Sequence, residues 1–327
     1  MKFEYLVPRT VAEAIGLLRQ YGGQAKVIAG GTDLMSGMRQ KLTRLRGVKY
    51  LVDIANISGL GSLREEQGQL GIGALATLRT LERSPLMREK CSLVAQAASQ
   101  VGSVAIRNAA TLGGNLCQET KCLHYAGIYR WGPAPCYHGG GAVCYAVSGA
   151  GSCQAMATNE LAPALICLDA EARVAGSDGE RIIPMEDFFI EPGDTSLAAN
   201  EILTEVKFSS PSSGRRVAYL KHTYMGIPGI AVVGVAAVLV VDGVICQDAR
   251  IAFIGGSTKP LRAHKAEEVL RGDRLSDAVI SRCGEVAARE AHPVSDGRAS
   301  AQYRRSMVKV LTRRVITQAA ADRGIQG

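Results

Sequence analysis

Residues 25–35 read AKVIAGGTDLM and join a short apolar segment to a glycine-rich turn. Alanine, valine and isoleucine in the first half predict a buried strand over residues 25–29, so the turn begins where the strand ends. Glycine allows the backbone to come close to a ligand, and unpaired N–H groups in such a turn can bind phosphate oxygens. The stretch therefore indicates a strand followed by a loop that either holds an anionic ligand or is an ordinary tight turn.

A second glycine pair occurs in TLGGNL at residues 111–116, where Thr111 and Asn115 flank Gly113 and Gly114. The hydroxyl and amide groups add hydrogen-bonding capacity beside the glycines. Neither turn has the G-x-G-x-x-G spacing of the Rossmann fold or the Walker A pattern of P-loops, so the residues do not support those two classes. From the residues alone, the two turns are either phosphate-binding turns or ordinary tight turns, and both alternatives stay open.

The segments around the first turn predict a small α/β unit. Thr10–Glu13 is a capping-box pattern that predicts a helix through about Tyr21, and a further strand is expected at residues 49–54. From Leu70 onward the pattern changes, which predicts a second, α+β layer. Its expected elements are short strands at 70–75, 172–176 and 181–189 around a helix at 85–101.

The clearest linker is Pro211–Gly214, and it separates a C-terminal domain. The expected elements of that domain are strands at 216–224, 230–241 and 249–255, then helices at 262–270, 276–291 and 298–320. This order predicts an antiparallel sheet backed by a helical bundle. In the last helix we expect a solvated basic face that includes Arg304, opposite an apolar stripe that starts at Tyr303.

Composition narrows the class of protein. The 327 residues are enough for two domains, and 47% hydrophobic with 21% charged residues are typical of a globular protein. The net charge of +8 lies on ordinary helix faces without interleaved aromatic residues, so we expect no nucleic-acid partner. The N-terminus lacks a signal-peptide pattern, and the longest apolar run, residues 230–241, is too short to span a bilayer. We therefore expect a cytoplasmic protein without a membrane segment.

Four of the nine cysteines lie in one irregular, glycine-rich stretch, KCLHYAGIYRWGPAPCYHGGGAVCYAVSGAGSC, at residues 121–153. In a reducing compartment, clustered cysteines are more often metal ligands than disulfides. Four thiolates suit a [4Fe–4S] cluster or a structural zinc ion, although the C-x13-C-x7-C-x8-C spacing lacks the close pairs of zinc ribbons and bacterial ferredoxins. His124 and His138 are further candidates for zinc, and free thiols are the third alternative.

Several motifs in one order resemble a known family. They are AGGTDL at 29–34, GIGALAT at 71–77, AIRNAATLGGNLC at 105–117, ELAPALICLDA at 160–170, YLK at 219–221 and QYRRSMVKVLTRR at 302–314. This order is similar to the FAD-binding subunit of the xanthine dehydrogenase family of molybdenum hydroxylases, nearly from end to end. The resemblance implies an α+β fold. A two-lobed FAD-binding domain of the vanillyl-alcohol oxidase or PCMH type would be followed by a domain like the C-terminal domain of carbon monoxide dehydrogenase flavoprotein.

The resemblance also implies domain boundaries and flavin contacts. The FAD-binding domain would cover residues 1–214, with lobes of about 1–56 and 57–214, and the second domain residues 215–327. The first glycine turn would wrap the FAD pyrophosphate, and the second would form the opposite wall. The implied cofactor residues are Ile28, Ala29, Gly30, Gly31, Thr32, Asp33, Leu34, Met35, Val101, Thr111, Gly113, Gly114, Asn115, Glu160, Leu203 and Lys221.

Two of these positions depart from the family pattern. Some relatives carry an aromatic side chain against the adenine where this chain has Val101. Relatives commonly have aspartate near the flavin where this chain has Glu160, which is longer by one methylene group. The longer side chain implies a rearranged or water-mediated hydrogen bond.

The cysteine-rich stretch is an insertion relative to the family pattern. In most such subunits the counterpart of ELAPAL follows GGNLC closely, whereas here residues 118–157 intervene. Cys117 belongs to the base pattern and so is not expected to be a ligand. The 4-hydroxybenzoyl-CoA reductase subgroup resembles this chain in carrying an extra [4Fe–4S] cluster on an insert at this place. That resemblance implies that the cluster ligands are Cys122, Cys136, Cys144 and Cys153.

The implied function is electron transfer, since the residues show no acid–base constellation for substrate chemistry. A large molybdopterin-binding subunit would hold the substrate, a small subunit would hold [2Fe–2S] clusters, and a ferredoxin-like protein would donate or accept electrons. The main hypothesis is a reductase that removes the hydroxyl group of an aryl-CoA, with electrons passing from [4Fe–4S] through FAD. The alternatives are an FAD subunit of an oxidative molybdenum hydroxylase and a flavin-free, zinc-bearing interaction module.

Overall fold

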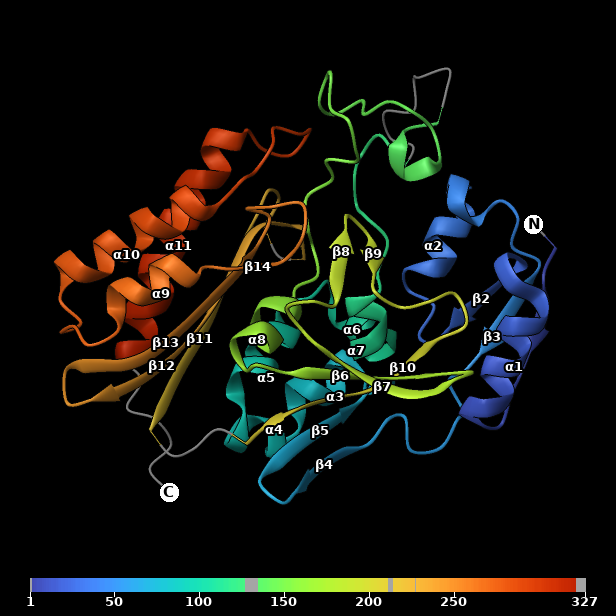
Figure 1. Cartoon of the computed structure of the whole chain (residues 1–327), viewed down its shortest axis with the longest axis horizontal. Coiled ribbons are helices and arrows are strands. Elements are labelled where there is room, and N and C mark those ends of the chain that lie inside the picture. The colour runs from blue at the N-terminus through green and yellow to red at the C-terminus, as the bar shows by residue number, and fades with distance from the viewer. Residues whose placement is uncertain (1, 127–134, 211–213, 227, 322–327) are drawn as a thin grey trace.

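The computed structural model describes residues 2–126, 135–210, 214–226 and 228–321 (Figure 1). Trp131 and most of the predicted 211–214 linker lie outside these ranges. Within them, the chain forms a small parallel unit, a mixed layer around a five-stranded sheet, and a C-terminal sheet covered by helices. The described parts of the segment between α7 (Leu112–Leu116) and α8 (Ala162–Cys167), residues 118–126 and 135–157, lie between the first and the last of these parts (Figure 1).

The first lobe is the α/β unit that the sequence predicted. Its parallel sheet has the order β1 (Glu4–Leu6), β3 (Tyr50–Asp53), β2 (Ala25–Ile28), and helix α1 (Val11–Tyr21) packs beside it. At the start of α1 the N-cap bond of the predicted capping box is present, and the Glu13 carboxylate accepts from the N–H of Arg9 in place of that of Thr10. The Thr10 hydroxyl accepts from the Glu13 backbone N–H at 3.1 Å, and the Glu13 carboxylate accepts from the Arg9 N–H at 2.7 Å. The remaining elements are η1 (Gly22–Gln24), α2 (Leu34–Arg39) and η2 (Thr43–Leu45).

The second lobe is built on a five-stranded antiparallel sheet. Its order is β4 (Leu63–Glu66), β5 (Gln69–Gly73), β10 (Ile202–Ser209), β6 (Glu171–Gly176), β7 (Gly179–Pro184). The central strand, β10, was missing from the sequence prediction. It contains Glu205 and Lys207 among its apolar residues, and Glu205 is tolerated inside the sheet because Arg64 pairs with it at 2.7 Å. A short hairpin, β8 (Phe189–Glu191) with β9 (Asp194–Thr195), projects toward the insert (Figure 1).

The helix predicted at residues 85–101 is wrong as a single element. The structure has α4 (Pro85–Lys90) and α5 (Ser92–Ser99), separated at Cys91, whose φ is −150°. The Cys91 N–H donates to the Met87 carbonyl at 2.9 Å, while the Cys91 carbonyl accepts from the Val94 N–H at 3.2 Å. One residue thus ends one helix and begins the next. The other helices of this lobe are α3 (Leu78–Arg83), α6 (Val104–Ala109), α7 (Leu112–Leu116) and α8 (Ala162–Cys167).

The C-terminal domain has the predicted antiparallel sheet and helices. The sheet has the order β11 (Arg215–Thr223), β12 (Ala231–Asp242), β13 (Ile245–Ile254), β14 (Leu261–Arg262), and the helices are α9 (His264–Leu270), α10 (Asp277–Glu290) and α11 (Ala301–Ala321). Alternate residues of β12 join two different cores, since Ala236 packs with the second lobe and Val235 with the helices. Burial on both faces explains the unbroken apolar run of this strand. No helix within the described ranges is long and apolar enough to cross a membrane.

The solvated face predicted for α11 is wrong at Arg304. This side chain is 1% exposed, whereas Tyr303, placed on the apolar stripe, is 44% exposed. The Arg304 guanidinium donates to both carboxylate oxygens of Asp296 at 2.9 Å and to the Val232 carbonyl at 2.6 Å. Burial alone would raise the pKa of Asp296, but the Arg304 charge lowers it below its usual value. A buried arginine is stable here because each of these contacts compensates for lost hydration.

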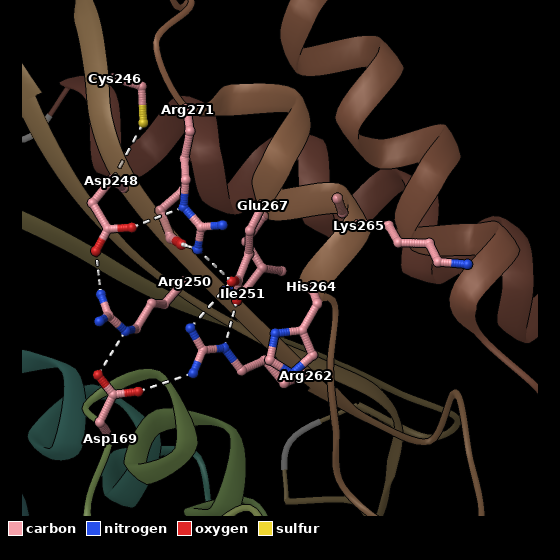
Figure 2. Close-up of polar contacts among 12 residues, drawn as sticks. Asp169, Cys246, Asp248, Arg250, Ile251, Arg262, His264, Lys265, Glu267 and Arg271 are labelled. Carbon is pink, nitrogen blue, oxygen red and sulfur yellow. Dashed lines mark hydrogen bonds and ion pairs between the residues drawn. The ribbon is translucent and has the colours of Figure 1, made fainter.

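An ion-pair network attaches the C-terminal domain to the second lobe (Figure 2). Asp169, two residues after α8, forms an ion pair with the Arg250 guanidinium at 2.7 Å and accepts from Arg262 at 2.9 Å. Behind them, the fully buried Glu267 accepts from Arg262 and Arg271, each at 2.8 Å, and from the Ile251 N–H at 2.9 Å. Asp169 has φ 48°, a left-handed conformation that aspartate and asparagine tolerate better than most residues.

We expect Asp169→Asn to weaken this attachment only modestly. The Asp169 side chain is 51% exposed, so loss of its charge should cost about 1 kcal/mol at low salt and less at high salt. Asparagine keeps the left-handed backbone, which isolates the effect of charge. Thermal unfolding at two salt concentrations measures it, and Asp178→Asn, on an exposed turn, is the control. A loss that does not change with salt would contradict the electrostatic explanation.

Candidate functional site

The two glycine turns lie against each other, and the contact explains Gly30. A Cβ atom at Gly30 would stand 1.7 Å from the Ala109 carbonyl oxygen, a distance that no side chain permits. Ala109 ends α6, two residues before Thr111. Gly31 has φ 68°, the left-handed conformation that glycine adopts without strain. Glycine is therefore required at position 30, because the first turn approaches the second too closely for a side chain.

The first turn also keeps free backbone donors. Within the described residues, the N–H groups of Gly30, Gly31 and Thr32 donate no hydrogen bond, and these residues are partly exposed. Unpaired N–H groups grouped in one turn are favourable for binding an anion such as a phosphate. This turn has the chemistry that the pyrophosphate of a dinucleotide requires.

The second turn differs, because its donors are already used. The Gly113 N–H donates to the Ala74 carbonyl at 2.8 Å, the Gly114 N–H to the Thr111 hydroxyl at 3.1 Å, and the Asn115 N–H to the Thr111 carbonyl at 2.9 Å. A Cβ atom at Gly113 would stand 3.1 Å from the Ala74 carbonyl oxygen. The glycines of the second turn thus allow close packing. The turn can form one wall of a site, but the N–H groups of these three residues are not available to bind a ligand.

A buried polar network joins three of the residues that the family resemblance singled out. The Asn115 amide donates to the Glu160 carboxylate at 3.2 Å, and the Lys221 ammonium pairs with the other Glu160 oxygen at 3.2 Å. The Lys221 side chain is 0% exposed and also donates to the Gln100 carbonyl at 2.5 Å and the Gly229 carbonyl at 3.0 Å. All three ammonium protons have an acceptor, as burial of a lysine requires.

The network connects α7, the loop before α8 and the C-terminal strand β11. Val101 follows Gln100, whose carbonyl accepts from the Lys221 ammonium, and it is buried in the core of the second lobe. Leu203 belongs to the buried core of the second lobe on β10, and no hydrogen bond of the network reaches it. The sequence did not indicate Gln100 and Gly229, because they contribute backbone carbonyls, which every residue type has.

Asp33 has a different surrounding from the one expected for a cofactor residue. Its carboxylate accepts from the Glu119 backbone N–H at 2.8 Å and pairs closely with the Lys121 ammonium. It thus links the first glycine turn to the beginning of the insert. Beside it, Ile28, Leu34 and Met35 belong to an apolar cluster that also contacts the insert, and Ala29 leads into the turn.

The four cysteines of the insert line one small cavity. Cys122, Cys136, Cys144 and Cys153 all contribute to its wall, with His124 and His138 among the other lining residues. Burial raises the pKa of Cys122, and it raises that of Cys153 to about 11, with the neighbouring cysteines adding to both. These two groups are therefore neutral thiols at neutral pH unless a bound cation stabilises their thiolates.

The other cysteines stand apart from this cavity. Cys117 is not among the residues that line it. All nine cysteines are free of disulfides. In the described part of the chain, no three or more histidine, cysteine, aspartate or glutamate side chains are grouped so that they could hold a single metal ion. A mononuclear site is thus not preformed, although the four thiols share one cavity.

Charged residues fix the insert to the first lobe and to the β8–β9 hairpin. His138 contacts the Glu119 carboxylate at 3.1 Å and the Arg44 guanidinium at 3.2 Å, and Arg44 pairs with Asp194 at 2.6 Å. Burial alone would raise the pKa of Glu119, but His138 and Arg44 lower it. On the other side, the Ala157 N–H donates to the Ser257 carbonyl at 3.1 Å.

Comparison with known families agrees with this geometry. Residues 1–211 match the family described as the FAD binding domain in molybdopterin dehydrogenase, and residues 228–319 match the CO dehydrogenase flavoprotein C-terminal domain. The chain belongs to the molybdopterin dehydrogenase FAD-binding family. The predicted fold class is confirmed, and the chain is an FAD-binding oxidoreductase subunit of molybdenum hydroxylase type.

Relatives of this family align over nearly the whole chain. The carbon monoxide dehydrogenase medium chain of Afipia carboxidovorans is 28% identical over 98% of this chain and 97% of its own length. The nicotine 6-hydroxylase medium subunit of Paenarthrobacter nicotinovorans is 30% identical, covering 97% of each. The crystal structure of cyanide-inactivated Cu,Mo-CO dehydrogenase superposes with a TM-score of 0.82 at 28% identity, covering 98% of each chain.

The names of these relatives help to distinguish the aryl-CoA reductase hypothesis from the oxidative hydroxylase hypothesis. All three are dehydrogenases or hydroxylases, and none is named for an aryl-CoA reductase or a [4Fe–4S] cluster. They support the oxidative alternative better than the reductase. The residues present fit the family's cofactor, because free N–H groups stand at the first turn and a paired cation, Lys221, stands beside the second.

Proposed function

We propose that this chain is the electron-transfer subunit of an oxidative molybdenum hydroxylase, carrying FAD and a [4Fe–4S] cluster. The observation that supports it is that two cysteines of the four-cysteine cavity pack against an apolar cluster that includes residues of the first glycine turn. Cys122 and Cys136 pack against the same apolar cluster as Ile28 and Met35. Two redox groups in these places would be close enough to exchange electrons, because tunnelling decreases steeply with distance.

FAD would lie along the first turn, with the second turn as its other wall. FAD supplies one- and two-electron redox chemistry when it is bound. The N–H groups of Gly30, Gly31 and Thr32 would bind the phosphates, and Lys221 with Glu160 would fix the charge near the flavin. We propose that Val101 and Leu203 supply apolar contacts, within domain boundaries of 1–214 and 215–327.

The cysteine cavity favours a cluster over zinc. A single zinc ion binds its sulfur ligands at about 2.3 Å from one centre. In a [4Fe–4S] cluster each thiolate binds a different iron, so the sulfurs stand farther apart. The four thiols share one cavity without forming a mononuclear site, which suits the larger group. Ligand binding would also order an insert that has little regular structure.

The substrate would be bound by partner subunits. Molybdenum chemistry requires a large molybdopterin-binding subunit, and a small [2Fe–2S] subunit would connect it to this chain. A ferredoxin-like protein would exchange electrons with the complex from outside. The chain itself then binds, orients and shields its redox groups, and this role agrees with the medium chain and medium subunit names of its relatives.

The aryl-CoA reductase is the second candidate, and the four-cysteine insert is the observation that favours it. The direction of electron flow separates the two. Reduced ferredoxin supplied to the purified complex with 4-hydroxybenzoyl-CoA should leave the thioester unchanged if the oxidative proposal holds. Loss of the aryl hydroxyl group would establish the reductase instead.

We expect Cys136→Ser to remove or remodel the cluster while FAD stays bound. Wild type should contain about four iron and four sulfide per chain, with a flavin band and a cluster EPR signal on reduction. The variant should lose most of the iron, because a cluster with three thiolate ligands is less stable. Anaerobic visible and EPR spectra with iron and sulfide analysis measure this outcome.

Cys117→Ser is the matched control for that experiment. Cys117 does not line the cavity, so its variant should keep the full iron content. Flavin with zinc and no iron in the wild type would leave a hydroxylase subunit with a structural insert. Colourless wild-type protein would overturn the flavoprotein assignment itself.

A further inference from the structure

The segment from α2 to β3 is basic on its outer side. Arg39, Lys41, Arg46 and Lys49 are exposed and form no ion pair with any described residue. The sequence from 34 to 52 contains no aspartate or glutamate. We call these four cations the 39–49 patch. Glu4 of the neighbouring strand β1 lies beside Lys49. A run of cations without acids in the same segment creates a local positive potential that attracts acidic partners.

The inner side of the same segment faces the cysteine cavity. Met38, Leu42, Leu45 and Val48 alternate with the cations and are all buried. They form one apolar cluster with Tyr125 of the insert, and Cys122 and Cys136 pack directly against it. Figure 1 shows α2 beside the insert at the same end of the molecule. One layer of backbone and side chains, roughly 10 Å for a helix, thus separates the patch from two of the thiols.

We propose that the 39–49 patch is the docking surface for a small, acidic electron-carrier protein of ferredoxin type. The inference rests on the proposed function, since it assigns the entry or exit of electrons to this face. A carrier that binds here would bring its redox centre close to Cys122 and Cys136 without touching the glycine turns. Charge complementarity would also orient the carrier, because the adjacent insert offers little charge of its own.

The surroundings of the patch suit a transient partner better than a permanent subunit. Within residues 118–157 the charged side chains are Glu119, Lys121 and Arg130, of which Glu119 and Lys121 are paired with lobe 1. Val143 and Tyr145 of the insert are exposed, at 41% and 37%. Separate cations without a large apolar area are typical of weak, electrostatically steered complexes. A permanent interface is larger and more apolar.

The carrier supplies or accepts each electron that this chain gains or loses. At each encounter one electron passes, so the carrier's iron centre changes by one unit of charge and the redox groups of this chain change by the opposite unit. No bond is formed or broken in this step, and no proton needs to move between the proteins. Two encounters match one two-electron oxidation at the partner subunit.

The test compares two double variants of the intact complex. Arg39→Glu with Arg46→Glu reverses two charges of the patch. Arg305→Glu with Arg314→Glu makes the same change on α11, where both arginines are exposed and form no ion pair with the described residues. The probe is an acidic [2Fe–2S] ferredoxin, and stopped-flow absorbance measures the second-order rate of electron exchange at several salt concentrations.

We expect the patch variant to be about tenfold slower at low salt, with a difference that disappears at high salt. The α11 control should match the wild type. Equal rates for patch variant and wild type would overturn the docking proposal, as would loss of a partner subunit from the patch variant on gel filtration. Iron content is measured on the same samples, so a missing cluster would count against the proposed function, whereas unchanged kinetics with full iron content would count against docking alone.

Discussion

Lys221→Met should destabilise the protein by about 3–5 kcal/mol, the usual cost of removing one partner from a buried ion pair. Glu160, which is 6% exposed, would lose its cation and keep the Asn115 amide as its remaining side-chain donor. The carbonyls of Gln100 and Gly229 would lose their donor as well. Because these groups join both domains, the midpoint of thermal unfolding should decrease by about 10 °C, and FAD should dissociate more readily.

Thermal unfolding and the fluorescence of released FAD measure the two effects separately. Lys309→Met is the matched control, since Lys309 pairs with Glu285 at 2.9 Å on the surface and is 39% exposed. It should cost far less than Lys221→Met, because both partners lie on the surface. Adding Glu160→Gln to Lys221→Met should recover part of the loss, because no unpaired charge then stays buried. Equal costs for Lys221→Met and Lys309→Met would show that the buried pair is not what holds the domains together.

The sequence predicted the elements whose apolar pattern is strong. The first lobe and the C-terminal sheet were found because α1 has a capping-box pattern and β12 is a continuous apolar run. Strand β10 was missed because Glu205 and Lys207 interrupt its pattern, although Arg64 neutralises Glu205 across the sheet. The break at Cys91 was missed because no proline or glycine marks it.

The candidate site was predictable only in part. Residues alone indicated two glycine turns and a thiol cluster, and the family resemblance added Glu160 and Lys221. That Asn115, Glu160 and Lys221 form one network depends on contacts between residues up to 61 positions apart. The contact of Asp33 with Lys121 spans 88 positions. Pairings of this kind are set by how the lobes meet, and a local pattern does not contain that information.

Gly30→Ala should have a comparable effect, through geometry rather than charge. The new Cβ atom would stand 1.7 Å from the Ala109 carbonyl oxygen, so the backbone of one turn has to move. A side chain could rotate away from such an overlap, but the carbonyl at the end of α6 cannot do so without moving the second turn. Overpacking of this kind typically costs about 1–3 kcal/mol of stability, and we expect a loss of about 3 kcal/mol here. The affinity for FAD should decrease because the two turns separate.

Gly61→Ala is the control, since nothing lies within 4 Å of a Cβ atom at Gly61 and its backbone needs no left-handed conformation. That variant should be neutral or slightly more stable, because alanine restricts the unfolded chain. FAD affinity, measured by titration of the deflavinated complex, separates the two variants most clearly. If Gly30→Ala bound FAD as the wild type does, the close contact of the two turns would not be what shapes the site, and the free N–H groups of the first turn alone would account for binding.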